Sequence, residues 1–338
     1  MIPICWAVTQ HFLCLRSENC KNTNERFNNE PTSGNVIVHD CVFSRTFSFS
    51  GDGGIFCFVD LFVNLNVYDS TFFDCSSQYH YGVIRARLNT INWERVCLYN
   101  CFTGYGHSWC IGYIETINSY NNMIFNMLSF SKCPSNSNER EKILTLRWGS
   151  MYLYNMNSSN NEIKQYGIEH SNPSYINGKY CSFSNNKLFV SILLQFEWGV
   201  GTREYSFSNF INNEQGSNER GLVHLQSTQA GDYLISNCVF INNTYYLFAY
   251  SNSNQGYNLV VKNSLIQHQS NKLTSGDVRT TNVSIATFQL HNLQIITFFS
   301  TYLCQTFQPQ RTLEKITIPS YYSLKIIFIL TDILINNE

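Results

Sequence analysis

Charged residues are scarce in this chain, at 13% of its 338 residues, and its net charge is −1. Lys and Arg form no cluster along the sequence. A nucleic-acid-binding face needs basic side chains concentrated against the phosphates. We therefore expect no nucleic-acid partner.

Several short motifs are also missing. No Cys-x-x-Cys pair occurs, which argues against a structural zinc site. The Gly-x-Gly segments lack the Lys of a phosphate loop, and no Gly-x-Ser-x-Gly nucleophile turn is present. The sequence thus predicts neither a metal nor a cofactor.

Long apolar runs are absent as well. The apolar segment Ile326–Leu330 lies between Lys325 and Asp332, and it is far shorter than the ~20 residues that cross a membrane. The segment 1–8 lacks the basic start of a signal peptide. We expect no membrane span and no clear secretion signal.

What the chain does contain is a repeat. Asp or Asn, then Cys or Ser, precede an apolar anchor residue in five copies, and degenerate copies end at Phe130, Phe183 and Phe210. The anchors recur at intervals of 26 to 30 residues, with one double interval of 53 that holds a further degenerate copy near 157–159. The anchors are Phe43, Phe72, Phe102, Phe130, Phe183, Phe210, Phe240 and Ile266. A period of roughly 27 residues with strand-like composition is typical of a stacked solenoid.

Each period holds two or three short apolar runs separated by Asn, Ser and Gly. Runs this short cannot each form a hairpin and also keep one period, so we expect one coil per period. Equivalent positions then stack about 4.8 Å apart, as neighbouring strands do in a sheet. We predict an all-β fold, a single-stranded parallel β-helix of about ten coils, right-handed by the bias of parallel crossovers.

Three parts are expected along the chain. An irregular segment or cap occupies 1–34, the parallel β-helix occupies 35–295, and a loop with a cap segment occupies 296–338.

Two columns of like side chains should run along the solenoid. Aromatic anchors are expected to point inward, and an Asn three residues after each is expected to form an amide ladder at one bend. Asn also tolerates the left-handed backbone of a tight bend. The residues of these columns are Phe183, Phe210, Phe240, Asn186, Asn213 and Asn243.

The 13 cysteines follow the repeat in part. Cys41, Cys101, Cys181 and Cys238 precede anchors, while Cys75 and Cys133 share another repeat position. Free Cys packs as a small buried hydrophobe, so these thiols are interpreted as column filler. Disulfides between neighbouring coils are the alternative, and the odd total leaves at least one cysteine over.

Catalytic carboxylates would have to lie on adjacent coils, as they do in β-helix polysaccharide lyases and hydrolases. The best candidates are Asp40 and Asp69, which share one repeat position and would lie about 5 Å apart. The same position is Asn100, Asn237 and Asn263 in other repeats, as an Asx turn requires. We therefore assign no catalytic residue and no metal ligand.

Three tryptophans and one histidine are further candidates. Trp109, Trp148 and Trp198 would offer platforms for sugar rings if exposed, but the apolar run around each predicts burial. His224 alternates with apolar neighbours, which predicts a surface side chain.

The Phe-x-Asn-Asn copies at 183–186, 210–213 and 240–243, together with Gly53-Gly54-Ile55-Phe56, resemble the repeats of polymorphic outer-membrane proteins. Similar β-helix surface proteins occur in parasitic protists such as trichomonads. The resemblance covers about 35–295, and it implies surface display and adhesion in an extracellular or cell-surface location.

We therefore expect a non-enzymatic repeat protein that presents an extended β-helix face to a protein or glycan ligand, for example in surface adhesion. The alternative is a carbohydrate-active enzyme, either a lyase or a glycoside hydrolase, or a glycan-binding module on the same fold. Three or more carboxylates and a base in one groove would favour the alternative. Featureless Asn, Ser and Thr faces would favour the first hypothesis.

Overall fold

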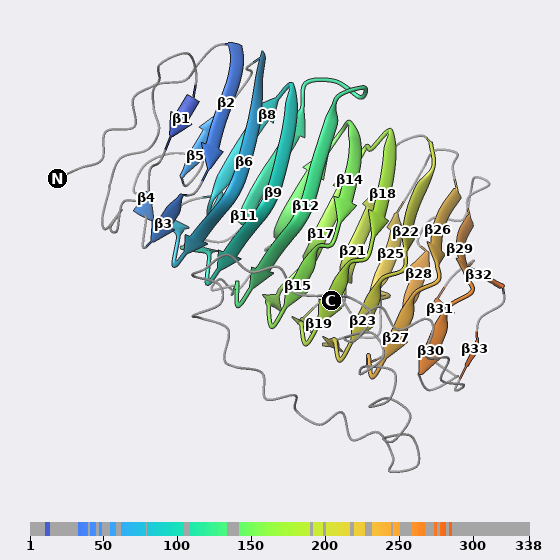
Figure 1. Cartoon of the computed structure of the whole chain (residues 1–338). Coiled ribbons are helices and arrows are strands. Elements are labelled where there is room, and N and C mark those ends of the chain that lie inside the picture. Colours follow the sequence, from blue (N-terminus) through green and yellow to red (C-terminus); the bar gives the residue numbers. More distant parts are fainter. Residues whose placement is uncertain are drawn as a thin grey trace, which may run out of the picture. The chain divides into compact units, whose positions relative to one another are not determined.

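The computed structural model describes residues 11–13, 33–39, 41–44, 47–48, 55–58, 62–78, 80–104, 109–133, 142–189, 192–198, 201–216, 220–226, 232–244, 246–250, 258–267, 274–275, 278–281 and 284–285. Within these ranges the regular elements are all β-strands. The strands pair in parallel and stack as a β-solenoid, which confirms the predicted fold class (Figure 1).

The solenoid has about seven turns spaced about 27 residues apart, whereas the sequence predicted about ten. By its contacts the chain divides into a unit of Met1–Thr301 and a second unit of Tyr302–Glu338. The second unit, most of the predicted N-terminal segment and Asp40 lie outside the described residues.

The largest sheet has 18 strands arranged in two rows, and β6, β9 and β12 run through both (Figure 1). The first row contains β1 (His11–Leu13), β2 (Ser33–His39), β6 (Phe62–Phe73), β9 (Thr90–Tyr99), β12 (Asn122–Ser131), β14 (Ser150–Tyr154), β18 (Tyr175–Lys179), β22 (Arg203–Ser206), β26 (Asp232–Ser236), β29 (Asn258–Lys262) and β32 (Val278–Thr281). The second row adds β3 (Val42–Ser44), β15 (Asn157–Ser159), β19 (Ser182–Ser184), β23 (Asn209–Ile211), β27 (Val239–Ile241), β30 (Leu265–Gln267) and β33 (Ser284–Ile285).

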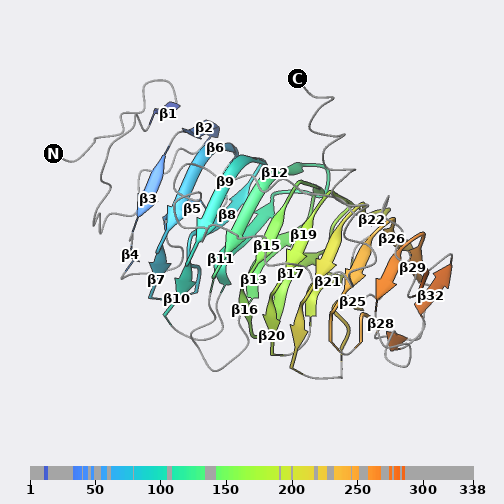
Figure 2. The same ribbon diagram turned by 60° about the horizontal axis from the view of Figure 1, so that its bottom comes forward.

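A nine-stranded sheet forms another side of the turns (Figure 2). Its strands are β5 (Phe56–Phe58), β8 (Ile84–Leu88), β11 (Trp109–Thr116), β13 (Lys142–Arg147), β17 (Tyr166–Ser171), β21 (Ile192–Glu197), β25 (Val223–Gln226), β28 (Phe248–Tyr250) and β31 (Thr274–Ser275). Two three-stranded sheets complete the turns with β4 (Phe47–Ser48), β7 (Ser76–Ser77), β10 (Phe102–Thr103), β16 (Glu162–Ile163), β20 (Lys187–Leu188) and β24 (Glu214–Gln215).

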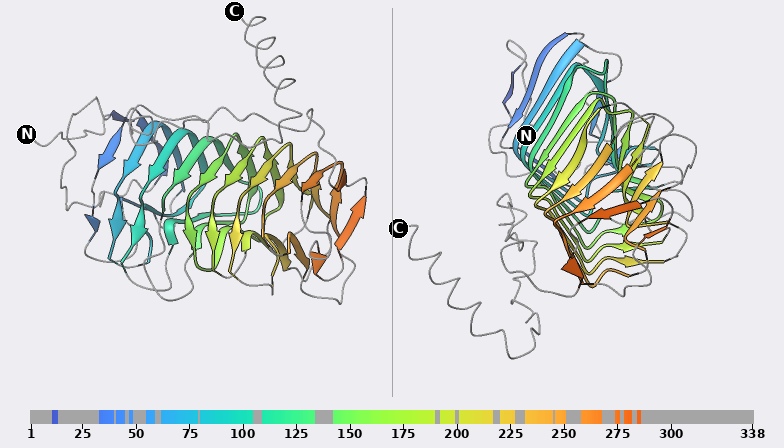
Figure 3. Two further views of the ribbon diagram at one scale, coloured as in Figure 1. Left: turned by 90° about the horizontal axis from the view of Figure 1, so that it is seen from below. Right: turned by 90° about the vertical axis from the view of Figure 1, so that its right-hand side faces the viewer.

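Each turn bends at residues in the left-handed backbone conformation, so that successive turns superpose (Figure 3). The first corner joins the two rows of the large sheet, with φ between 47° and 57° at Asp69, Arg95, Met127, Asn155, Tyr180, Phe207, Asn237 and Asn263. The second corner follows that sheet, with φ between 51° and 54° at Asp74, Asn100, Lys132, Asn160, Asn185, Asn212 and Asn242. Asn and Asp are common here because they tolerate this conformation better than other L residues do.

The aromatic column forms as predicted. The rings of Phe183, Phe210 and Phe240 are fully buried and stack with centroids 4.9 and 4.5 Å apart. Phe43 and Phe72 stack in the same way at 4.8 Å.

The anchor predicted at Phe102 is wrong, because Phe72 pairs with Leu98 in the next turn. Phe102 pairs with Ser76 and lies beyond the second corner. The Asn100-Cys101 pair therefore belongs to the second corner, although its composition matches the motif of the first.

The amide ladder also forms, and it is longer than predicted. The side-chain Nδ2 of Asn161, Asn186 and Asn213 each donates to the Oδ1 of the next Asn, at 3.0, 2.9 and 2.9 Å. Asn243 receives the last of these bonds and donates to the backbone oxygen of Phe210. Burial makes this bonding obligatory, because an amide without partners inside the protein is costly.

Cysteine side chains occupy two repeated positions along the solenoid. Cys75, Cys101 and Cys133 occupy the ladder position in the earlier turns, and Cys41, Cys181 and Cys238 occupy a position beside the first corner. The backbone N–H groups of those last three cysteines each donate to a Ser hydroxyl in the next turn. These six and Cys57 are free and buried, which supports the filler interpretation for them, whereas Cys97 is disulfide-bonded.

Candidate functional site

Two broad faces of the solenoid differ in chemistry. On the first row of the large sheet, outward side chains such as Asn64, Asn66 and Tyr68 bond to one another and to amides of neighbouring turns. The outward face of the nine-stranded sheet instead carries guanidinium groups, carboxylates and aromatic rings. This second face is the candidate functional site.

In-register pairing arranges the outward residues of the nine-stranded sheet in two rows. Strand β8 shows the cause, since Arg85 and Arg87 alternate with buried Ile84, Ala86 and Leu88. The Thr145 row consists of Arg85, Tyr113, Thr145, Glu169, Gln195 and His224. The Arg147 row consists of Arg87, Glu115, Arg147, Ser171, Glu197 and Gln226.

A cavity of about 460 Å³ opens where these rows begin. Three guanidinium groups and one carboxylate line it, so its lining carries more positive than negative charge. We call it the cationic cavity, and its lining residues are Tyr81, Arg85, Ala86, Arg87, Tyr113, Glu115, Arg147 and Trp148.

The guanidinium groups of this cavity are held by their neighbours. Glu115 Oε1 lies 3.4 Å from Arg87 Nε, and Glu115 Oε2 lies 3.8 Å from Arg147 Nη1. The Tyr113 hydroxyl donates to Glu115 at 2.7 Å and accepts from Arg147 at 2.9 Å. Burial raises the pKa of this phenol above its ordinary value, so the hydroxyl keeps its proton.

Aromatic faces lie against the same cations. The Arg147 guanidinium lies 4.8 Å, and that of Arg87 5.8 Å, from the centre of the Trp148 ring. Arg85 lies 5.3 Å over the ring of Tyr81. Cation–π contact fixes the orientation of these groups without neutralising their charge.

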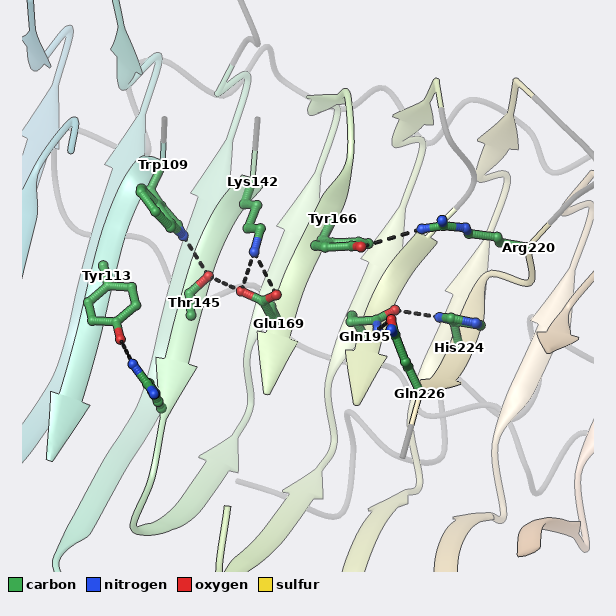
Figure 4. Close-up of polar contacts among 11 residues, drawn as sticks. Trp109, Tyr113, Lys142, Thr145, Tyr166, Glu169, Gln195, Arg220, His224 and Gln226 are labelled. Carbon is green, nitrogen blue, oxygen red and sulfur yellow. Dashed lines mark hydrogen bonds and ion pairs between the residues drawn. The ribbon is translucent and has the colours of Figure 1, made fainter. Parts of the chain in front are cut away.

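A carboxylate that accepts three hydrogen bonds from two side chains lies on this face (Figure 4). Lys142 Nζ donates to both oxygens of Glu169 at 2.6 and 2.7 Å. Thr145 donates to Glu169 Oε2 at 2.5 Å and accepts from Trp109 Nε1 at 2.6 Å. With its oxygens engaged and its side chain 4% exposed, Glu169 serves as an anchor for Lys142 and, through Thr145, for Trp109.

Glu197 lies on the next strand, β21, and its carboxyl group has a shifted pKa. Burial, and then the charge of Glu169, raise the pKa of its carboxyl to about 7. Glu197 is only half-buried, and exposed Trp198 follows it. This carboxyl is therefore protonated in part at neutral pH.

Uncharged side chains bond to one another at the far end of the Thr145 row. His224 Nδ1 lies 2.6 Å from Gln195 Oε1, and Gln195 donates to Gln226 (Figure 4). His224 faces outward as predicted, but it is covered, with 3% exposure, so its prediction as a surface side chain was wrong. Burial lowers its pKa to about 4, which keeps the ring uncharged at neutral pH.

The candidate Asp69 lies away from this face, at the first corner. Both of its oxygens accept hydrogen bonds from Arg95 of the next turn, at 2.6 and 2.8 Å. Its backbone φ of 47° explains why Asn replaces it in other repeats. Its Asp40 partner lies outside the described residues, so the proposed pair has no further support.

Burial of the tryptophans was predicted wrongly. Trp198 is 44% exposed, and Trp109 and Trp148 are half-buried. Trp148 and Trp198 have positive φ at a third corner, so they lie beyond the apolar strands from which their burial was inferred. Trp109 stacks on Tyr81 on the outward side of β11, at 4.8 Å.

Among the described residues, no group of three or more His, Cys, Asp or Glu has the arrangement of a metal site. The described part of the chain also contains no helix of the length and apolarity that crossing a membrane requires. Comparisons with protein-family models, curated proteins and solved structures returned no match to this chain.

Proposed function

We propose that this chain is a non-enzymatic binding protein that recognises a glycan along the outward face of the nine-stranded sheet, as in adhesion. The observation that carries the proposal is the two rows of charged and polar residues that run across six neighbouring strands of this sheet. A ligand that lies along the solenoid axis would contact the accessible members of the Arg147 row, which are Arg87, Arg147, Glu197 and Gln226, whereas Thr145, Glu169, Gln195 and His224 of the other row are buried.

Ring platforms favour a glycan as the ligand. Trp148 and Trp198 occupy equivalent corners two turns apart, which places them about 10 Å apart along the axis at the strand spacing of a sheet. Two consecutive sugar units of an extended chain cover a comparable length. An indole face packs against the C–H face of a pyranose, and the polar rows beside it can bond the hydroxyls.

Surface location and adhesion belong to the same proposal. They are supported by the resemblance of the repeats to those of surface β-helix proteins, and by a fold that offers many equivalent positions along one axis.

The test is a glycan array probed with the purified chain and two variants. Trp198→Ala should reduce the signal of every glycan bound. Tyr180→Ala is the matched control, because Tyr180 is 41% exposed, also has positive φ and lies at the first corner, away from the face. A wild-type chain that binds no glycan, or variants that lose binding equally, would refute the proposal.

Glycoside hydrolysis is the second candidate. It is favoured by one observation: Glu197 is half-buried and its pKa is raised to about 7, as that of the general acid of a glycosidase is. Release of reducing ends from bound oligosaccharides, abolished by Glu197→Gln, would establish this activity. Binding without any cleavage would leave the first function standing.

A further inference from the structure

We infer that the cationic cavity is a subsite for a sugar residue that carries a carboxylate or a sulfate. This inference rests on the glycan-binding function proposed above and adds the class of glycan.

Charge is the first argument. The cavity is lined by Arg85, Arg87 and Arg147 against the single carboxylate of Glu115, so three positive charges face one negative charge. The whole chain has only 22 Lys and Arg residues among 338. A lining with this excess attracts an anion and disfavours a cation.

The type of cation is the second argument. All three basic groups are guanidinium groups, which present a planar fork of N–H donors that matches the oxygens of a carboxylate or sulfate. Lys142, the nearest ammonium group on this face, is instead bound to Glu169. The cavity therefore collects the groups suited to recognise an oxyanion by geometry.

The third argument is that the site is preorganised. Arg147 is oriented by the Tyr113 hydroxyl and the Trp148 ring, and Arg87 by Glu115 and the same ring. Guanidinium groups that are already ordered lose less conformational entropy when a ligand binds.

The backbone under Trp148 gives the fourth argument. This residue has φ of +58°, which is unfavourable for a bulky side chain, and the next turn has Asn172 at the same corner. Gly149 follows with φ of +71°, and a Cβ there would lie 2.6 Å from the backbone oxygen of Asn121. This strained turn thus places the Trp148 ring beside Arg87 and Arg147. A bound sugar ring with an anionic substituent requires both an aromatic face and cations next to it.

Size and shape agree with this ligand. The volume of about 460 Å³ falls within the range of small-ligand pockets. Tyr81 and Trp148 supply aromatic rings to the lining, and Arg87 and Arg147 lie against the ring of Trp148. A sugar ring can pack against an aromatic face while its charged substituent bonds to Arg87 or Arg147.

The experiment measures binding of three oligosaccharides of equal length by calorimetry: a sulfated one, a uronate without sulfate, and a neutral one. We expect the anionic ligands to bind at least about tenfold more tightly than the neutral one at low salt, and to weaken as salt is added. Binding of both anions, or of one alone, supports the subsite and identifies the recognised group.

Three variants localise the effect. Arg147→Lys keeps the charge but loses the planar fork, and should weaken anionic binding about tenfold. Trp148→Asn keeps the tolerance for positive φ and should weaken it as well. Arg95→Lys is the matched control, because the Arg95 side chain is 34% exposed against 37% for Arg147 and lies at the first corner. If Arg147→Lys does not fold, which a thermal melt would show, Arg85→Gln replaces it, because Arg85 lines the same cavity.

The failures of the two proposals are distinguishable. Equal affinity for neutral and anionic oligosaccharides, unchanged in Arg147→Lys, would overturn the anion subsite and leave glycan binding in place. If no oligosaccharide binds and only an acidic phosphopeptide does, both the subsite and the glycan function are overturned.

Discussion

At the scale of single residues, the Phe-x-Asn-Asn motif assigns different tasks to two identical neighbours. The first Asn, as in Asn212, is exposed and adopts positive φ at the second corner. The second, as in Asn213, is fully buried and bonds to amides in the turns before and after it. One residue type suits both positions because Asn tolerates the left-handed backbone and also carries both a donor and an acceptor.

The two positions should therefore respond differently to substitution. Asn213→Leu removes the buried acceptor of the Asn186 backbone N–H and one of the donors to Asn243 Oδ1, and it should lower the free energy of unfolding by about 1–3 kcal/mol. Asn212→Gly should change it by only a few tenths, since Gly adopts positive φ freely. Urea unfolding of both variants measures the difference, and equal losses would contradict the ladder.

Substitution of Asp69 tests whether the carboxylate at the first corner has a functional role. Asp69→Asn keeps the positive φ and the side-chain carbonyl but loses the ion pair with Arg95. Because both side chains are at least a third exposed, the free energy of unfolding should fall by less than about 1 kcal/mol. Glycan binding should be unchanged. A variant that loses binding or activity would restore Asp69 as a functional carboxylate.

Glu197 should make stability depend on pH. Its folded-state pKa is raised from 4.5 to about 7, so between these values the folded chain holds a proton that the unfolded chain has lost. Stability therefore falls as the pH rises through this window, by at most about 1.4 kcal/mol per pH unit, and the loss is complete above pH 7.

Glu197→Gln removes this titration. The variant should gain stability relative to the wild type at pH 8 and match it at pH 4, by urea unfolding at each pH. Glu162→Gln, at an exposed carboxylate, is the control. A constant difference between Glu197→Gln and the wild type across this range would contradict the shifted pKa.

At the scale of the elements, strands of two or three residues hold together because their side chains stack in columns. Strand β23 is only Asn209–Ile211, yet its Phe210 ring lies between those of Phe183 and Phe240. Offset and stacked rings at these separations add to the stabilisation that burial alone provides.

Removal of one ring should show the strength of the column. Phe210→Ala should lower the free energy of unfolding by about 3–5 kcal/mol through the cavity that it leaves. Phe207→Ala is a control three residues away, because Phe207 is half-buried at the first corner and stacks only on exposed Tyr180. Calorimetric melts compare the two, and a smaller effect at Phe210 than at Phe207 would be inconsistent with an inward column.

The sequence was sufficient to predict these columns, because a fixed period and an in-register parallel sheet imply each other. It misplaced Phe102 because corner motifs of like composition occur twice in each turn, and only strand pairing separates them. The cationic cavity was missed for a related reason. Arg85, Tyr113, Arg147 and Trp148 belong to three different turns, and nothing local in the sequence indicates which outward residues meet.

At the scale of the whole described solenoid, each turn contacts mainly the turns before and after it. Stability in such a structure is close to a sum of terms for each turn and for each interface between turns. A damaged interface therefore weakens its neighbourhood more than distant turns. The outward face of the nine-stranded sheet, whose two rows cross six strands, depends on several interfaces at once.

The change from thiols to amides along one column has a mechanical consequence. Interfaces after Cys133 are joined by an amide-to-amide bond between side chains, whereas Cys75 and Cys101 bond to backbone oxygens at 3.3 and 3.6 Å with weak thiol donors. Under a force applied along the axis, the turns with thiols should separate before those with amides. The cationic cavity begins in the turns with thiols. An adhesive contact at this cavity would then fail because the turns with thiols separate, while the turns with amides stay paired.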